Sequence, residues 1–532
     1  MSRLLRVLAW SALAAGCVVA AGTQQQLEAT TSGSASTPAD TANLRALTAS
    51  AAGHSSVSAR LVHGSDTAEM TLTHSGSTPR SLLNRVVCDN QSEPQRLYWC
   101  EVTDIRGPAA STVGRAEGDP ASGSLDQQVH LVYDLLGFTS DYYTERFGYD
   151  LTDNIGLGVQ GDPDGTRTLS ATVNACSETN PYCDDINAYW MPAPLADDFN
   201  SYQLIGGSIS ISAGLAGISD VIAHELQHGV TDAIANLAYQ GQAGAINESI
   251  SDVFGELVDR AKQLKDHGQI QYQWSIGDGY TWGGVASQPL PFLRSLSDPY
   301  GKPTQAPTRL PGQAQGCRGW QPDRMSSPCW DTDPRNDDYG GVHTNSGVGN
   351  KLAYLVSAGG TFNGHKVTGI GDDATAKLWW DLLPRLSSNA DYYELGNDLA
   401  GACASLVAKS ALVANACTTT VKPAIRATEI ANRRVTFSRL PTRVKAGATI
   451  KPIVRVGAWM RSDLNVPMYG QTAYLQMRSG GRWIAIAKAR TDASGVARFA
   501  AKIRATGVYR LALAANQVVG ETGGTRVTIR VS

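Results

Sequence analysis

The stretch Asp220-Val221-Ile222-Ala223-His224-Glu225-Leu226-Gln227-His228 decides how the centre of this 532-residue chain folds. Ser219 or Asp220 can cap a helix that runs through to His228. Residues four apart lie on one face of a helix, so His224 and His228 present two imidazoles to the same point. Imidazole is a good zinc ligand, and Glu225 lies beside the pair. The pattern predicts a zinc site, although two surface histidines on an ordinary helix would give the same five residues.

A second segment downstream supplies the remaining ligand. A catalytic zinc takes three protein ligands and keeps one position open, and Glu248 follows His228 by 20 positions on the next predicted helix, Ile246 to about Leu264. Asp252 is one turn further on the same face, where it can accept a hydrogen bond from a ligating imidazole. A purely structural zinc would normally use four protein ligands, often cysteines.

Several ordered motifs make residues 126–430 similar to the thermolysin-like family of neutral metallopeptidases. Besides the opening stretch, which extends through Gly229-Val230-Thr231-Asp232, the motifs are Asn187-Ala188-Tyr189-Trp190, Gly244-Ala245-Ile246-Asn247-Glu248-Ser249-Ile250-Ser251-Asp252, Leu293-Arg294-Ser295-Leu296-Ser297-Asp298-Pro299 and Gly340-Gly341-Val342-His343-Thr344-Asn345-Ser346-Gly347. Ser357-Ala358-Gly359-Gly360-Thr361 followed by Gly369-Ile370-Gly371 also fits. Ordered matches of this kind are far more specific than one pentapeptide.

The resemblance implies a catalytic role for each of these residues. His224, His228 and Glu248 would bind one zinc ion, which lowers the pKa of a bound water and polarises the scissile carbonyl. Glu225 would be the general base that takes a proton from the zinc-bound water and passes it to the leaving amine. The other matches are His343 and Tyr239 for oxyanion stabilisation, Asp338 for orienting His343, and Asn247 and Asp252 as partners of the zinc histidines.

The resemblance also implies how a peptide substrate is held. Asn187, Ala188 and Arg294 match residues that bind the substrate backbone, Ala188 through its main chain alone. An apolar pocket would include Val221, Ile276 and Leu293, which favours cleavage before a bulky apolar residue. Ordinary core packing explains these three side chains equally well.

A calcium site near the zinc helices is expected to be reduced. Asp220, Asp259 and Asp278 match ligand positions of the family, whereas Gln273 and Ser275 stand where acidic residues are usual. Because Ca²⁺ needs several oxygen ligands, one calcium ion rather than two is expected.

The N-terminus and the cysteines indicate export. Residues 1–22 have a basic start followed by a short apolar run, typical of a signal peptide, although an N-terminal membrane anchor is the alternative. Cys17 lies within this segment, and attachment of a lipid to its side chain is a less favoured alternative. The other eight cysteines form sequence-close pairs, which suggests four disulfides rather than a zinc site: Cys88/Cys100, Cys176/Cys183, Cys317/Cys329 and Cys403/Cys417. We expect a secreted protein.

Composition divides the rest of the chain. The composition of residues 23–87 predicts a low-complexity linker or a short pro-segment. Residues 88–431 predict an α+β metallopeptidase domain, with a mixed β lobe to about 230 and a helical lobe beyond. Residues 432–532 predict a small all-β sandwich, because short runs such as Ile453–Val456 and Tyr474–Met477 alternate with glycine turns. The last segment resembles bacterial immunoglobulin-like modules through Trp483, Thr491-Asp492-Ala493-Ser494-Gly495 and Tyr509-Arg510.

Charge is divided unevenly between these parts. Residues 433–532 carry a net charge of +15 and the remainder −18, within a total of −3. A basic domain of this kind favours binding to a polyanionic cell-surface polymer, whereas no recognised motif supports nucleic acid. A solvated positive surface with no ligand is the alternative.

These features predict a secreted, monomeric zinc endopeptidase that cleaves proteins or peptides. One alternative is a catalytically weak surface-binding protein that uses the basic C-terminal domain. Another is a zinc hydrolase acting on a non-peptide bond. The first is disfavoured because Glu225, His343, Tyr239 and Asp338 are all present, and the second because Asn187 and Arg294 match peptide-binding residues.

Overall fold

The computed structural model describes most of the chain beyond the first fifty residues. The described residues are 54–63, 66–75, 83–91, 97–100, 102–103, 110–120, 127–159, 167–175, 186–193, 204–271, 274–278, 292–300, 321–331, 338–430, 433–459, 465–468, 470–515 and 522–532. The predictions on residues 1–22 with Cys17, on the pair Cys176/Cys183, on Cys317 and on Gln273 lie outside these ranges. Within them, no helix has the length and apolar character needed to span a bilayer.

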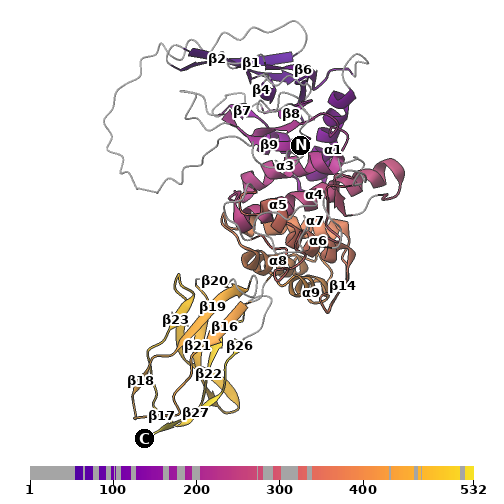
Figure 1. Ribbon diagram of the computed structural model, residues 1–532. Helices are drawn as coiled ribbons and strands as arrows, with labels where there is room; N and C mark the ends of the chain where they lie inside the picture. The colour runs from indigo at the N-terminus through magenta and orange to yellow at the C-terminus, as the bar shows by residue number, and fades with distance from the viewer. Residues whose placement is uncertain are drawn as a thin grey trace, which may run out of the picture. The chain divides into compact units, whose positions relative to one another are not determined.

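A six-stranded mixed sheet forms the centre of the first of two compact units, drawn in indigo and magenta in Figure 1. Strands β3, β8 and β11 are parallel, and β9 pairs antiparallel with β11 at the end of the described order. Every residue of β8 is buried, as expected for a central strand. In sheet order the strands are β4 (Leu97–Cys100), β6 (Ala110–Ala116), β3 (Arg85–Asp89), β8 (Leu169–Val173), β11 (Gly207–Ile211) and β9 (Ala188–Pro192).

Two smaller sheets belong to the same unit. Strands β1 (His54–His63) and β2 (Asp66–Ser75) form an antiparallel pair joined by β5 (Val102–Thr103). The sequence predicts a linker over residues 23–87, and the structure instead has β1, β2 and the first half of β3 there. The alternation in Ala68–Leu72 is the period-2 signal that predicts a strand. Strands β7 (Gly158–Val159) and β10 (Leu204–Ile205) form a further pair.

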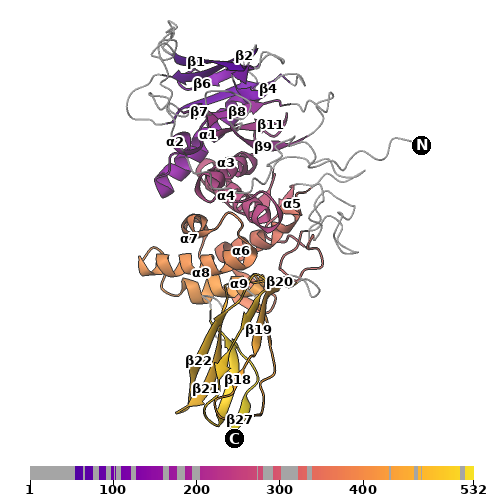
Figure 2. The same ribbon diagram turned by 90° about the vertical axis from the view of Figure 1, so that its left-hand side faces the viewer.

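Helix α1 (Gln127–Phe147) packs against the sheet through β3 and β8. Its buried residues Val129, Val132 and Leu136 recur at the helical spacing that predicts a helix from Asp126. Figure 2 shows α1 beside the sheet and the short helix α2 (Leu151–Ile155) next to it.

Helices α3 (Ser219–Ile234) and α4 (Gly241–His267) approach closely at Gly255. A Cβ atom on Gly255 would lie 2.6 Å from the carbonyl oxygen of Asp220, so only glycine fits this contact. Helix α4 is longer at both ends than the predicted Ile246–Leu264 segment. The close approach fixes the position of the His224 turn against the middle of α4, because the same Cβ would also lie 3.4 Å from the Cβ of His224.

The helices after residue 340 belong to the second unit. They pack in succession, with α6 against α7 and α7 against α8. The predicted helices at 350–357 and 374–386 correspond to α6 and to α7 with the 3₁₀ turn that follows it. The elements are α5 (Val342–Asn345), α6 (Gly347–Ala358), β14 (Gly360–Phe362), β15 (His365–Val367), α7 (Asp372–Leu382), η3 (Leu383–Arg385), α8 (Tyr392–Ala408), η4 (Cys417–Val421) and α9 (Lys422–Ala427).

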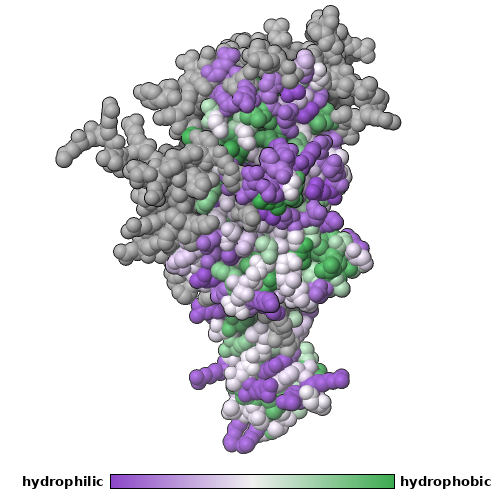
Figure 3. All heavy atoms as spheres, turned by 90° about the vertical axis from the view of Figure 1, so that its right-hand side faces the viewer, coloured by the Kyte–Doolittle hydropathy of each residue, from purple (hydrophilic) through white to green (hydrophobic). Residues whose placement is uncertain are grey.

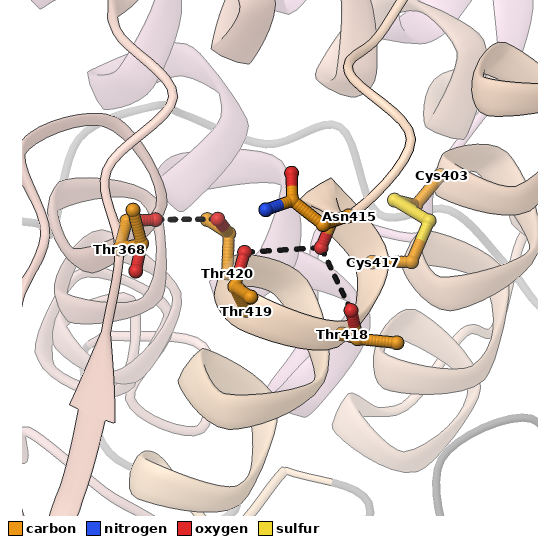
Figure 4. The surroundings of a disulfide bond; sticks show 7 residues. All are labelled: Thr368, Cys403, Asn415, Cys417, Thr418, Thr419 and Thr420. Carbon is orange, nitrogen blue, oxygen red and sulfur yellow. Dashed lines mark hydrogen bonds between the residues drawn. A yellow bond between two sulfur atoms is a disulfide. The ribbon is translucent and has the colours of Figure 1, made fainter.

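One predicted disulfide is confirmed in this helical region. Cys403 of α8 is bonded to Cys417, the first residue of the π-helical turn η4. Figure 4 shows that this turn is also held by the hydroxyls of Thr418 and Thr419, which donate to the carbonyl of Asn415. Cys88 and Cys329 are disulfide-bonded as well, and their pairing with Cys100 and Cys317 stays a prediction.

From Arg433 onward every described element is a strand. One set runs in the order β16-β19-β20 and another in the order β17-β27-β25-β21-β22. A single apolar cluster, which includes Val454, Leu475 and Leu511, forms the core. The strands are β16 (Arg433–Phe437), β17 (Arg443–Val444), β18 (Thr449–Ile450), β19 (Ile453–Trp459), β20 (Asn465–Pro467), β21 (Thr472–Ser479), β22 (Arg482–Arg490), β23 (Val496–Arg498), β24 (Ala501–Lys502), β25 (Gly507–Leu513), β26 (Thr522–Gly523) and β27 (Val527–Val531).

Candidate metal centre

Helix α3 carries the two histidines and the glutamate of the predicted zinc motif. The Nε2 atoms of His224 and His228 are 3.0 Å apart, so the two rings converge on one point. Both side chains are buried, as is Glu225. Oε2 of Glu225 accepts a hydrogen bond from the backbone N–H of Trp190 in the edge strand β9 at 2.8 Å. This bond holds the carboxylate beside the histidine pair.

Glu248 completes the predicted ligand set. One ligand atom each from His224, His228 and Glu248 lies within 4.8 Å of the other two. Two imidazole nitrogens and one carboxylate oxygen, all buried, are the donor set of a catalytic zinc site with an open fourth position. These three residues fit zinc, and they are the three that the sequence predicts.

His343 lies beside Glu248 and is held by Asp338. Its Nδ1 is 2.6 Å from Asp338 Oδ1, and its Nε2 is 3.4 Å from Glu248 Oε1. The hydroxyl of Tyr239 donates to Glu248 and lies 3.3 Å from His343 Nε2. Burial alone would lower the pKa of His343, but Glu248 and then Asp338 outweigh it and raise the pKa to about 9.

A tight turn places Asp338 against the helix that bears His343. Tyr339, Gly340 and Gly341 all have positive φ, which returns the chain on itself just before α5. The Asp338 carboxylate also accepts from the backbone N–H groups of His343 and Thr344, both at 3.2 Å. The turn that orients the His343 imidazole therefore requires Gly340 and Gly341.

Asp252 forms a buried ion pair with Arg294. Nη2 and Nε of Arg294 contact the carboxylate at 2.6 and 2.9 Å, and Nδ2 of Asn350 donates to it at 2.7 Å. Burial opposes the charge of Arg294, but Asp252 outweighs it and raises the pKa of the guanidinium. Arg294 also lies 3.9 Å from Glu248. Its described contacts therefore support the metal ligand, and its predicted contact with substrate stays a prediction.

A second acidic group lies near α3. Ligand atoms of Asp220, Glu256 and Asp278 fall within 4.8 Å of one another. Burial, followed by the charges of the neighbouring carboxylates, raises the pKa of Asp220 and of Glu256 well above the ordinary range. The carboxylate of Asp259, a further predicted calcium ligand, contacts Ser219 and Gln263, and its role as a ligand stays a prediction.

Sequence reasoning missed Glu256 and Asn350. Glu256 could have been found, because it is an acidic residue inside the apolar run Val253–Val258 and lies one turn after Asp252. Asn350 lies 98 residues from Asp252, and no local pattern links the two. Gln321 is a further partner, since its Nε2 donates to the carbonyl of His343 at 2.6 Å.

The residues predicted to bind substrate differ in their exposure and in their contacts. Asn187 is exposed just before β9, and its side chain accepts from the N–H of Ala188 at 3.0 Å. Val221 and Ile276 are buried and Leu293 is half-buried, which core packing explains equally well. Asn247 is 2% exposed beside Glu248, and its predicted role stays a prediction.

Comparisons with known proteins agree with this geometry. Residues 235–424 match the family model described as thermolysin metallopeptidase, alpha-helical domain. A zinc metalloproteinase from Renibacterium salmoninarum is 35% identical over 348 residues, which are 63% of this chain and 55% of that protein. Thermolysin from Alicyclobacillus acidocaldarius is 32% identical over 299 residues, which are 54% of this chain and 45% of that protein. The chain therefore spans about half the length of these relatives.

A solved structure has also been compared. The precursor of protealysin from Serratia proteamaculans aligns at 26% identity with a TM-score of 0.44, over 66% of this chain and 88% of that one.

A helix-borne histidine pair with a distant glutamate is the ligand arrangement of a zinc site with an open position, and it lies in and beside a region that matches a metallopeptidase domain. In this part of its length the chain is similar to the thermolysin-like metallopeptidases.

Proposed function

We propose that this protein is a secreted zinc endopeptidase that hydrolyses internal peptide bonds of proteins. The observation that carries the proposal is the buried group His224, His228 and Glu248 with the carboxylate of Glu225 beside it. The similarity to the zinc metalloproteinase of Renibacterium salmoninarum and to thermolysin supports it. Paired cysteines and the composition of residues 1–22 support export.

The chain's own residues provide the acid–base and electrostatic parts of catalysis. Zinc, held by His224, His228 and Glu248, would supply a Lewis acid that polarises the carbonyl and acidifies a water. Glu225 takes the proton of the attacking water and delivers it to the leaving nitrogen. His343, held by Asp338, stabilises the oxyanion together with the hydroxyl of Tyr239.

The position of β9 supports a peptide substrate. It is the last strand of the described sheet order, and an extended peptide can add to such an edge through backbone hydrogen bonds. Asn187 at the start of β9 and Arg294 would hold the peptide backbone. Val221, Ile276 and Leu293 would favour a bulky apolar residue at the new N-terminus.

Metal removal tests the proposal. We expect the purified full chain to contain about one zinc ion, to cleave casein, and to lose this activity with o-phenanthroline, because the chelator competes with the three protein ligands for the metal. Dialysis into zinc should restore activity. Zinc content by atomic absorption and casein hydrolysis measure the two effects. Casein cleavage that persists without zinc would refute the proposal, and His365→Ala, a histidine away from the site, is the control.

We further propose one structural calcium ion at Asp220, Glu256 and Asp278. Asp220 Oδ1 and Glu256 Oε2 have no hydrogen-bond partner among the described residues, so two buried carboxylate oxygens are available to a cation. The other oxygen of Asp220, Oδ2, accepts a hydrogen bond from the backbone N–H of Gly277 at 2.7 Å. Hard oxygen ligands suit Ca²⁺, with the remaining positions filled by water or backbone carbonyls.

Calcium should therefore raise the free energy of unfolding of the wild-type chain but not that of the Glu256→Gln variant. A ligand at about a hundred times its dissociation constant adds about 2.7 kcal/mol to the free energy of unfolding. Without calcium, the raised pKa values mean that the folded state holds more protons than the unfolded state above about pH 4. Stability should consequently fall as the pH rises, until calcium is added.

Thermal unfolding in calcium-free buffer with equimolar zinc, at pH 5.5 and pH 8, measures both effects. Glu145→Gln, an exposed glutamate of α1, is the matched control and should respond to calcium as the wild type does. Equal stabilisation of Glu256→Gln by calcium would exclude this site.

For residues 432–532 we propose a β-sandwich module that binds an anionic polymer. The strand-only composition, the single apolar core and the net charge of this segment support the proposal. Such a module would keep the peptidase near a charged surface.

A further inference from the structure

One face of the C-terminal sheet collects basic side chains. In the sheet β17-β27-β25-β21-β22, residues such as Leu475, Leu511 and Ile529 point into the apolar core, so their chain neighbours point outward. We call this outward side the basic face. It carries Arg443, Arg478, Lys488, Arg490, Arg510 and Arg530.

The basic face has no compensating negative charge on its strands. None of β17, β21, β22, β25 and β27 contains an aspartate or glutamate. Arg443 and Arg530 are direct register partners, and both are exposed. Like charges directly opposite on a sheet destabilise it, so folding alone does not explain this arrangement. Figure 3 shows hydrophilic side chains projecting at the lower end of the molecule, where Figure 1 draws these strands.

Arg510 is held in position at the centre of the face. Its Nε donates to Oε1 of Gln476 at 2.7 Å, and its guanidinium lies 4.2 Å from the ring centroid of Trp483. Arg526, just before β27, lies 5.9 Å from the same ring. A guanidinium fixed in this way loses little conformational freedom when it binds an anion.

The geometry fits a polymer with repeated anionic groups better than a single small anion. Neighbouring strands are about 4.8 Å apart, and alternate residues along a strand are about 6.8 Å apart. The register partners Arg443 and Arg530, and the alternate residues Lys488 and Arg490 of β22, therefore lie within a Debye length of each other, about 8 Å in physiological salt. Five of the six side chains are arginine, whose planar fork matches a carboxylate.

Aromatic rings among these cations indicate a sugar polymer. Trp483 is the register partner of Arg478, and Tyr474 is the register partner of Lys488. Rings beside cations suit a repeating unit that has both an apolar ring face and a carboxylate. Single-stranded nucleic acid would require a series of aromatic platforms for successive bases, whereas the described strands of this face carry two outward aromatic rings, Tyr474 and Trp483.

We propose that the basic face binds an acidic polysaccharide, a linear glycan with a carboxylate on its sugar units. The proposal deepens the polymer-binding role given above for residues 432–532, on which it rests. It does not depend on peptidase activity, so the two can fail separately.

Binding of the full-length zinc-loaded chain to sodium polygalacturonate tests this proposal. We expect saturable binding by isothermal titration calorimetry in 0.15 M salt, weakening steeply as salt increases. The triple variant Arg478→Gln/Arg510→Gln/Arg530→Gln should bind about tenfold to a hundredfold more weakly, because each exposed ion pair contributes modestly. Casein hydrolysis by this variant should equal that of the wild type.

Two controls distinguish binding by the basic face from binding through the net positive charge of the domain alone. Arg455→Gln removes an exposed arginine on β19, in the other sheet, and should leave polygalacturonate binding unchanged. Trp483→Leu should weaken binding to polygalacturonate more than binding to inorganic polyphosphate. The proposal would be overturned if the wild type did not bind polygalacturonate. It would also be overturned if Arg455→Gln weakened this binding as much as the triple variant does, or if the wild type bound polyphosphate or single-stranded DNA more tightly than polygalacturonate. Circular dichroism of each variant verifies that the domain remains folded.

Discussion

Glu225→Gln should lower the kcat for casein by about a hundredfold to ten-thousandfold while zinc remains bound. Positioned general bases contribute rate factors of this size, and the amide of glutamine cannot accept a proton. The substitution is nearly isosteric. The oxygen of the amide can still accept from the N–H of Trp190, which Oε2 of Glu225 does at 2.8 Å in the wild type. The fold and the positions of His224 and His228 should therefore persist.

The measurement combines steady-state kinetics with zinc content by atomic absorption. Glu145→Gln, on the exposed surface of α1, should retain wild-type kinetics and controls for the loss of one negative charge. Full activity of Glu225→Gln with zinc bound would remove Glu225 from the reaction. Loss of zinc from this variant would instead assign Glu225 to metal binding.

Arg294→Ala should lower the free energy of unfolding by about 3–5 kcal/mol. Removing one member of a buried ion pair leaves the other charge without compensation, and Asp252 has no exposed surface. Asn350 would still donate to the Asp252 carboxylate. The same substitution removes a positive charge 3.9 Å from Glu248, so zinc affinity should change as well.

Urea unfolding in excess zinc measures this effect. Arg385→Ala is the matched control, because Arg385 pairs with Asp381 within one helical turn near the surface, and such pairs contribute about 0.5 kcal/mol. Arg294→Lys should recover part of the loss, since it keeps the charge but not the two-point contact. A change below 1 kcal/mol for Arg294→Ala would show that the pair does not stabilise the fold.

The parts of the site that follow from local periodicity could be predicted from the sequence. His224, Glu225 and His228 share one turn of a single helix, and Glu248 and Asp252 share another, so helical spacing alone aligns them. The same reasoning found α1. The pairing of Cys403 with Cys417 followed from their short separation of 14 residues.

The parts that depend on distant contacts could not be predicted. Asp252 meets Asn350 across 98 residues, and Tyr143 of α1 donates to Gln227 of α3 across 84. Strands β1 and β2 were missed because threonine and serine dominate the segment, which resembles a linker in composition although its apolar residues alternate. The role of Arg294 was assigned to substrate by resemblance, while its tertiary contacts lie with Asp252 and Glu248.

The basic face has a practical consequence for handling the protein. A chain with a calculated pI of 6.3 and a net charge of −3 would ordinarily flow through a cation-exchange column at pH 7.5. Adsorption to a resin depends on the charge that one side of a molecule presents, and the strands of the basic face offer cations without a single acid. The protein should therefore be retained on sulfonate resin and elute with salt, whereas proteolytic loss of residues 432–532 would convert it to an anion-exchange binder.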